Sequence, residues 1–300
     1  MRGALSIIGA GRVGRALGRR LQELGWKIGA VVSRSEGSAR RAVRFIGAGK
    51  AQTTLSRDIL ASRVILISTP DDVVSKVAGE LARIGAEELR GKIVLHTSGA
   101  LNSDVLRVLR QCGASTGSMH PLQSFSGVAI PPLEGKAFAI EGDAAAVRCA
   151  RQIVRALGGL PVQIAGGSKA LYHAAAAFAA GHVLAIEETS ARLLMLTGMK
   201  RGEAVRALLQ LTRQVLENFE RLGARAAWTG PLARGDHGVV AAHLSAMQPL
   251  PREFSTAYAA LNDLATLVLS ADSARILTGL HEGSRNKSSR VKLHYAGGKA

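Results

Sequence analysis

The feature that most constrains this chain is a glycine-rich turn directly after its first apolar segment. Residues 4–8 read as a strand, Gly9, Gly11 and Gly14 follow in the spacing G-x-G-x-x-G, and a helical pattern begins there. In such a unit the first glycine permits a tight turn, the second lets a pyrophosphate approach the backbone, and the third lets the helix pack on the strand. The N–H groups and positive end of the helix then favour phosphate. The turn predicts dinucleotide binding by Gly9, Ala10, Gly11, Arg12, Val13 and Gly14; the alternative is a turn whose glycines serve geometry alone.

The end of the second strand indicates which dinucleotide is bound. The apolar run 26–32 leads into Ser33, Arg34 and Ser35, with no acidic residue at the tip. A site for NAD usually places Asp or Glu there to hold the ribose 2′-hydroxyl, whereas a guanidinium suits a 2′-phosphate. We therefore predict NADP(H), with these three residues around the 2′-phosphate. In an arginine-rich protein the alternative is a solvated loop arginine.

Strand-like and helical patterns alternate through the first half of the sequence. Apolar runs recur at residues 26–32, 50–54, 63–68, 91–96, 114–119, 136–142 and 161–165. Continuous apolar strands joined by helices are typical of a parallel sheet covered on both faces, which binds ligands beyond the carboxyl ends of its strands. We predict an α/β fold with a Rossmann-type, doubly wound, mostly parallel sheet. The strand tips that should converge on one crevice are Gly9, Ser33, Thr69, Ser98 and His120.

After residue 165 long helical patterns replace the strands, at residues 168–197, 201–222, 236–247 and 252–270. The sequence thus predicts an NADP-binding Rossmann domain at residues 1–165 and an all-α substrate and dimerisation domain at residues 166–282. A basic, low-complexity tail at residues 283–300 is expected to be flexible. The broad apolar face of the first long helix suggests a homodimer.

The charge and composition limit the choice of partners. The formal net charge of +17 could indicate nucleic-acid binding, but the arginines are dispersed and no aromatic platform or nucleic-acid motif accompanies them. We expect a solvated basic surface that favours an anionic cofactor, and no nucleic acid. No apolar run reads as a membrane span or a signal peptide, so we expect a cytoplasmic protein with no membrane partner. Cys112 and Cys149 match no metal or redox spacing and should be reduced thiols, so no metal is expected.

A lysine opens the first long helix, where a cation is disfavoured by both burial and the helix dipole. Lys169 and His173 are four residues apart and project from one face, with Tyr172 one step round. Hydride transfer to a carbonyl develops negative charge on oxygen, which a lysine ammonium can stabilise and protonate. We therefore predict Lys169 and His173 as catalytic residues and Tyr172 as a substrate contact. The alternative is a snorkelling lysine beside a core histidine.

Other polar residues at predicted tips and turns could contact the ligands. Thr69, Pro70, Ser98 and Gly99 should border the cofactor's ribose and nicotinamide, because they end two neighbouring strands. His120 and Gln123 follow a third strand and could bind substrate, or form an ordinary turn. Arg234 precedes a helix and could grip a substrate carboxylate.

Several of these segments together resemble a family of bacterial Rossmann-like oxidoreductases that carry a C-terminal helical domain of unknown function (the 2520 type). The matching segments are the glycine turn and residues 69–71, 96–99, 120–125, 169–173 and 229–236. The wider group includes 6-phosphogluconate and β-hydroxyacid dehydrogenases, ketopantoate reductase and pyrroline-5-carboxylate reductase. The resemblance implies a Rossmann domain plus a helical domain that often mediates dimerisation. Lys169 falls on the catalytic lysine of a Lys-x-x-x-Asn pattern, whereas His173 replaces its asparagine.

These observations predict an NADP-dependent oxidoreductase that reduces a small carbonyl acid, a keto acid or semialdehyde, with Lys169 as proton donor. One alternative is an imine reductase resembling pyrroline-5-carboxylate reductase, in which Lys169 would be less useful because an iminium develops no oxyanion. Others are a catalytically silent NADP-binding sensor and a protein that binds nucleic acid through its basic tail.

Overall fold

A computed structural model describes residues 3–127 and 129–270, and the predicted tail at residues 283–300 lies outside them. The chain forms two compact units, Met1–Val183 and Leu184–Ala300. The predicted domain boundary near residue 165 falls just after the last strand, and the division between the compact units falls later, within the long helical run. Each unit is considered separately below.

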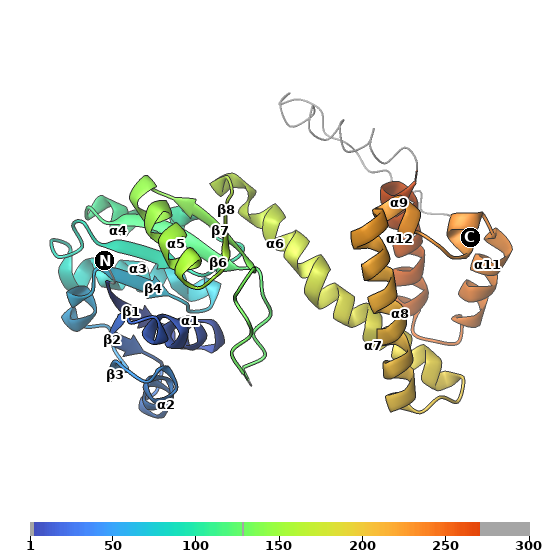
Figure 1. Ribbon diagram of the computed structural model, residues 1–300, viewed down its shortest axis with the longest axis horizontal. Coiled ribbons are helices and arrows are strands. Elements are labelled where there is room, and N and C mark those ends of the chain that lie inside the picture. Colours follow the sequence, from blue (N-terminus) through green and yellow to red (C-terminus); the bar gives the residue numbers. More distant parts are fainter. Residues whose placement is uncertain (1–2, 128, 271–300) are drawn as a thin grey trace, which may run out of the picture. The chain divides into compact units, whose positions relative to one another are not determined.

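The first unit is built on one eight-stranded sheet with the order β3-β2-β1-β4-β5-β6-β7-β8 (Figure 1). The chain crosses from β1 to β2 and β3 on one side and then to β4, β5 and β6 on the other, so the sheet is doubly wound, as predicted. All pairs are parallel except β6 with β7, which is antiparallel. The strands are β1 (Ala4–Ile8), β2 (Lys27–Val32), β3 (Lys50–Gln52), β4 (Val64–Ile67), β5 (Ile93–His96), β6 (Ser115–Pro121), β7 (Ala137–Gly142) and β8 (Leu160–Gln163).

Alternate residues of the strands supply two separate cores, one on each face of the sheet. Leu66 faces the core formed with α1 (Arg12–Glu23), α2 (Glu36–Ile46) and α5 (Ala144–Ala156). Its neighbours Ile65 and Ile67 face the core formed with η1 (Arg57–Ala61), α3 (Asp71–Gly85), η2 (Ser103–Leu106) and α4 (Arg107–Gln111). Burial on both faces explains why these strands are continuously apolar instead of alternating.

The first unit ends in a helical run that begins with η3 (Gly166–Ser168) and α6 (Lys169–Ala177). The single helix predicted for residues 168–197 contains a wider π-helical turn, η4 (Phe178–His182), before α7 (Val183–Leu196). By length and composition the run Gly166–Leu196 could cross a membrane, and none of its most apolar window is buried. Within this run, Lys169 donates to the carbonyl of Ser98, just after β5, and to Ser118 Oγ on β6.

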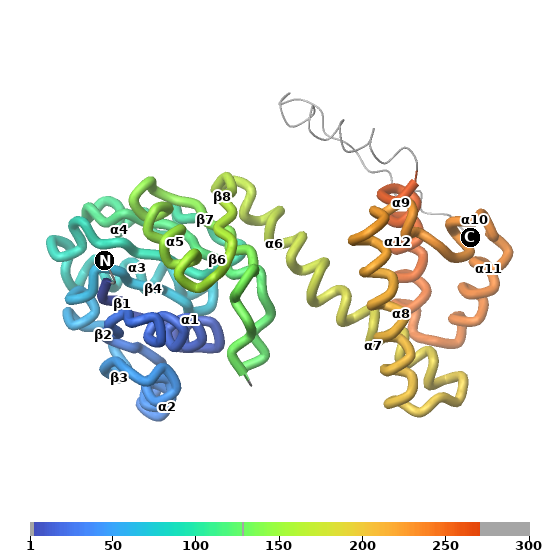
Figure 2. Tube along the Cα trace, viewed as in Figure 1, coloured from blue at the N-terminus to red at the C-terminus, as the bar shows by residue number. Residues whose placement is uncertain are grey.

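The second unit is entirely helical in its described part, and Figure 2 traces it from yellow to red. An ion pair between Glu188 and Arg201 joins α7 to the next helix, and His243 contacts Tyr258 between two later ones. Four buried side chains are described here: Ala191, Ala204, Ala227 and Met247. The helices that follow α7 are α8 (Arg201–Leu222), α9 (Ala224–Ala227), α10 (Pro231–Arg234), α11 (His237–Ala246) and α12 (Arg252–Leu269).

Candidate active site

The glycine turn has the geometry that a dinucleotide requires. Gly9 has a φ of 87°, and a Cβ there would lie 2.6 Å from the backbone nitrogen of Thr69. At Gly14 a Cβ would lie 2.6 Å from the carbonyl oxygen of Gly9, so only glycine lets α1 pack this closely. Gly11 is different, because nothing lies within 4 Å of its missing Cβ. The open space is therefore at the position where a pyrophosphate would approach.

The electrostatics of the same turn also favour an anion. The first turn of α1 contains no acidic residue, so the unpaired N–H groups at its N-terminus remain available to a phosphate. At the tip of β2, the Ser33 N–H donates to the carbonyl of Gln52, and Arg34 is exposed. Ser35 caps α2 by accepting from the N–H of Ser38. The loop is thus held by its neighbours, while the Arg34 side chain is exposed.

A cleft of about 390 Å³ opens at the carboxyl ends of the central parallel strands. Thr69 Oγ1 is buried there and has no hydrogen-bond partner among the described residues. An orphaned donor beside the glycine turn fits a polar cofactor. The predicted cofactor residues that line this cleft are Gly11, Arg12, Val13, Thr69, Pro70, Ser98 and Gly99. The predicted substrate residues His120 and Gln123 and the predicted catalytic residue His173 also line it.

Lys169 is placed at the first position of α6 and is only 2% exposed. Its Nζ donates to the carbonyl oxygen of Ser98 at 2.6 Å and to Ser118 Oγ at 2.8 Å. Burial lowers the pKa of Lys169 to about 8, although the negative charges of Glu141 and Asp71 oppose the shift. The lysine therefore lies next to the cleft wall, behind Ser98, and not in the open cleft.

Two histidines, His120 and His173, line the cleft, and Tyr172 contacts the first of them. His120 Nδ1 pairs with Tyr172 Oη at 2.9 Å, and the rings of His120 and His173 meet edge to face. A Cβ on Gly99 would lie 2.4 Å from His173 and 2.9 Å from His120, so glycine at this position lets both rings approach the strand end. Burial, helped by the positive charges of Lys169 and His173, lowers the pKa of His120 to about 4. Burial raises the pKa of Tyr172 to about 12.

Two predicted substrate residues, Gln123 and Arg234, already have polar partners in the structure. Gln123 lines the cleft, but its amide donates to the carbonyl of Pro132 and accepts from the N–H of Ser124. Arg234 lies on α10 in the second unit, where its guanidinium pairs with Asp236 at 3.0 Å. Asp236 occupies the N-cap position of α11 but makes no side-chain cap bond and pairs with Arg234 instead.

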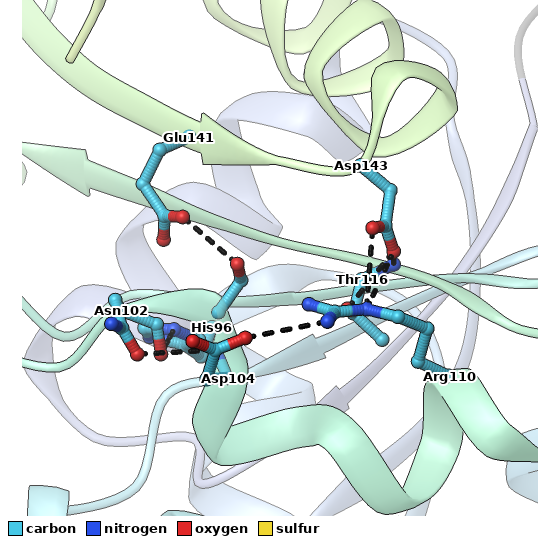
Figure 3. Close-up of polar contacts among 8 residues, drawn as sticks. His96, Asn102, Asp104, Arg110, Thr116, Glu141 and Asp143 are labelled. Atoms are coloured by element: carbon cyan, nitrogen blue, oxygen red, sulfur yellow. Dashed lines mark hydrogen bonds and ion pairs between the residues drawn. The ribbon is translucent and has the colours of Figure 1, made fainter. Parts of the chain in front are cut away.

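The sequence analysis missed a buried polar cluster that surrounds Lys169. Ser118 accepts from the lysine, and Glu141, only 5% exposed, accepts from Ser103 Oγ at 2.8 Å. Figure 3 shows Glu141 reaching from β7 toward the segment that carries Asn102 and Asp104. His96 Nδ1 accepts from the Ser98 N–H, and burial with the charge of Lys169 lowers the pKa of His96 to about 4. The sequence signal that could have revealed this cluster is Glu141, a charged residue inside an apolar strand pattern.

Two family models match the chain. A Rossmann-like domain matches residues 1–121, and a domain of unknown function, DUF2520, matches residues 136–264. A comparison with curated proteins finds no match.

Among similar solved structures, protein TM1727 from Thermotoga maritima is 25% identical, with 90% of this chain and 99% of that chain covered and a TM-score of 0.66. Protein BF3122 from Bacteroides fragilis, described as a candidate NADP oxidoreductase, is 21% identical, with 88% and 97% covered and a TM-score of 0.71. A reductive aminase from Aspergillus terreus, solved with NADPH and ethyl-5-oxohexanoate, is 18% identical, with 95% and 94% covered and a TM-score of 0.61. The last two likenesses show the fold alone. The chain thus consists of a Rossmann-like domain joined to a DUF2520 domain.

Proposed function

We propose that this protein is an NADP-dependent oxidoreductase that reduces a small carbonyl acid, a keto acid or a semialdehyde. The observation that carries the proposal is a buried lysine ammonium beside a cleft that also contains the glycine turn. A buried cation is costly unless its surroundings hold it for a purpose. A positive charge next to a hydride-transfer cleft can stabilise and protonate the oxygen of a reduced carbonyl.

In this proposal, main-chain and side-chain groups of the first unit hold the cofactor. Gly9, Ala10, Gly11, Arg12, Val13 and Gly14 form the pyrophosphate cradle, and Ser33, Arg34 and Ser35 surround the 2′-phosphate. Thr69, Pro70, Ser98 and Gly99 border the ribose and nicotinamide, where the unpaired Thr69 hydroxyl offers a donor. When bound, NADPH supplies the hydride.

The chain's own residues supply the proton and orient the substrate. Lys169 binds Ser98 and Ser118 through two N–H groups, and the proposal requires the third to reach past Ser98 to the reacting oxygen in the cleft. With a pKa of about 8 it is mostly protonated at neutral pH and still a stronger acid than an ordinary lysine. His173 assists from the cleft, and His120, Gln123 and Tyr172 position the substrate.

Replacement of the lysine tests the catalytic role. Lys169→Met should reduce NADPH oxidation by carbonyl acids by roughly 10²- to 10⁴-fold, because it removes the general acid. NADPH affinity, measured by calorimetric titration, should change little. The matched control is Lys76→Met at an exposed position of α3, which should keep full activity. Full activity in Lys169→Met would remove the lysine from the mechanism.

Replacement of Arg34 tests the choice of cofactor. Arg34→Ala should weaken NADPH binding roughly tenfold or more, because a charge-assisted hydrogen bond to the 2′-phosphate is lost. NADH binding should barely change. The control is Arg44→Ala, which removes a positive charge from an exposed position of the neighbouring α2 and so measures the effect of net charge alone. Equal weakening of NADPH and NADH would show that Arg34 does not read the phosphate.

A second candidate function is imine reduction, and the likeness to the A. terreus reductive aminase favours it. The cleft's neutral His120, hydrogen-bonded to Tyr172, could orient an iminium without needing an oxyanion partner. Screening keto acids against cyclic imines separates the two reactions. A silent NADP-binding sensor would bind NADPH, oxidise it with neither class, and tolerate Lys169→Met.

The proposed enzyme is a cytoplasmic homodimer in which residues 1–165 bind the cofactor and residues 166–282 supply substrate and dimer contacts. Exposed apolar side chains such as Leu184 (70% exposed) and Leu196 (68%) support the dimer, because isolated soluble helices rarely expose such surfaces. We propose no role for nucleic acid or membrane.

A further inference from the structure

Glu141 is a buried carboxylate for which the proposed reaction so far has no use. It lies on β7 next to Gly166, where an added Cβ would come within 3.3 Å of Oε2. Ser103 Oγ donates to Oε2, whereas Oε1 is buried with no hydrogen-bond partner among the described residues. Leaving a charged oxygen buried and unpaired is expensive. A carboxylate kept at such a cost points to a role beyond packing.

This carboxylate lines a second opening, which is separate from the cofactor cleft. It has a volume of about 420 Å³ and shares no lining residue with the cleft, and we call it the polar hollow. Its lining includes Asn102, Ser103, Asp104, Arg110, Glu141 and Asp143. Figure 3 shows Arg110 on α4 between two of these carboxylates. Its guanidinium lies 3.3 Å from Asp104 and 3.2 Å from Asp143, so the two partners neutralise it locally. Glu141 is thus the acidic group of the hollow that no described cation pairs with directly.

Lys169 and Glu141 together connect the two openings. Lys169 donates to the carbonyl of Ser98, a residue of the cleft wall, and to Ser118 Oγ. Ser118 on β6 is the direct strand partner of Glu141 on β7, which brings the Glu141 carboxylate near the same ammonium. The other titratable groups that face the ammonium are Asp71 on α3, His96 on β5, His120 on β6 and Tyr172 on its own helix. Only Glu141 among them also lines the polar hollow.

We propose that Glu141 is a positioning residue that keeps Lys169 protonated and returns protons to it from the polar hollow. The proposal rests on the proposed reductase function, in which each turnover removes one proton from Lys169. The carbonyl carbon gains a hydride, its oxygen gains the Lys169 proton, and a neutral amine remains. The amine then takes a solvent proton that reaches it from the polar hollow through the Glu141 carboxylate, which ends the cycle ionised again. One solvent proton is consumed per carbonyl reduced.

The first test follows the lysine directly and needs no substrate. In cofactor-free protein labelled with ¹³C-lysine, the Lys169 signal is assigned by its absence in Lys169→Met and titrated by NMR. Glu141→Gln should lower the pKa of Lys169 below its value in the unmodified protein by about one unit, because a buried negative charge is removed. The conservative Glu141→Asp should restore part of the shift. Asp104→Asn makes the same carboxylate-to-amide change in the polar hollow and should leave the titration unchanged.

The second test uses the pH dependence of NADPH oxidation with an accepted carbonyl acid. In Glu141→Gln the rate should start to fall at a lower pH, because Lys169 loses its proton earlier. The solvent deuterium isotope effect should also increase, because proton return becomes slower. A merely structural role would lower the rate without moving the pH profile. An unchanged Lys169 titration in folded Glu141→Gln, checked by circular dichroism, overturns the proposal. If no carbonyl or imine is reduced at all, the reductase function fails, while the NMR titration still decides whether the two groups are coupled.

Discussion

The two units of this chain use apolar side chains in opposite ways. The first unit buries its aliphatic residues in two cores on either side of one sheet. The second unit buries four described side chains and exposes large apolar ones along α8, including Leu211 (63% exposed), Leu216 (58%) and Phe219 (56%). Apolar surface removed from water stabilises a fold by about 25 cal/mol per Å². The sheet of the first unit therefore buries its own apolar residues, whereas the helical run that ends this unit, with Leu171 77% exposed, and the second unit leave apolar surface uncovered. We propose that a second copy of the chain covers it.

The difference also explains where the candidate chemistry lies. The cleft, the polar hollow and Lys169 all belong to the first unit, whose sheet and cores hold strand tips in fixed positions. Rigid elements position reacting groups better than exposed helices do. The following predictions would break or sharpen this contrast, in order of decreasing effect.

The largest effect is expected at the most crowded position of the first unit. Gly14→Val should cost at least about 3 kcal/mol of unfolding free energy and abolish NADPH binding, because its side chain would overlap the Gly9 carbonyl. Urea denaturation measures the stability. The control is Gly79→Ala on α3, where nothing lies within 4 Å, and which should stabilise by up to about 1 kcal/mol. A stable, NADPH-binding Gly14→Val variant would contradict the tight packing of α1 on the sheet.

An intermediate effect is expected on the exposed face of the second unit. Leu216→Glu should weaken the dimer at least roughly tenfold, because it places an unpaired charge in an apolar interface. NADPH affinity should persist, since the cofactor residues lie in the first unit. Sedimentation velocity over a concentration series gives the dissociation constant. Gln210→Glu adds the same charge at an exposed polar position of α8 and serves as control. If both variants behave as the unmodified protein does, this face of α8 is not the interface.

The smallest effect concerns acid stability and again belongs to the first unit. His96 and His120 have folded-state pKa values of about 4, below the usual 6.5, so the unfolded chain binds protons first as the pH falls. Their contribution to stability is complete above pH 6.5 and is lost between pH 6.5 and 4. Over this pH interval the free energy of unfolding of His120→Asn should fall by roughly 1 kcal/mol less than that of the unmodified protein. This value is reduced for partial solvent screening. Identical slopes in thermal melts at a series of pH values would show that His120 is not held neutral.

Much of the first unit could be predicted because its signals are local. The strands at residues 64–67 and 93–96 follow from short apolar runs, and the turn at Gly9 follows from glycine spacing. The antiparallel entry of β7 into the sheet had no such signal, since its apolar run looks like that of any buried strand. The π-helical turn at residues 178–182 was equally invisible, because its alanines and glycine suit an ordinary helix.

The candidate site divides in the same way. Lys169 could be singled out because a cation at the start of an apolar helix is costly in any fold. Its neighbours Ser118 and Glu141 could not, since they are 51 and 28 positions away along the chain and meet it only through strand order. Likewise, no local pattern shows that Lys169 lies behind Ser98 and not within the cleft.

The amino-acid sequence by itself determined the doubly wound sheet, the glycine cradle and the change to helices after residue 165, because hydrophobic periodicity and backbone freedom act over a few residues. Only the tertiary structure decided which buried polar groups surround the lysine and which of two openings each one faces. Those relationships depend on strand pairing and burial, which bring together residues that share no local signal and set the charge that each can carry.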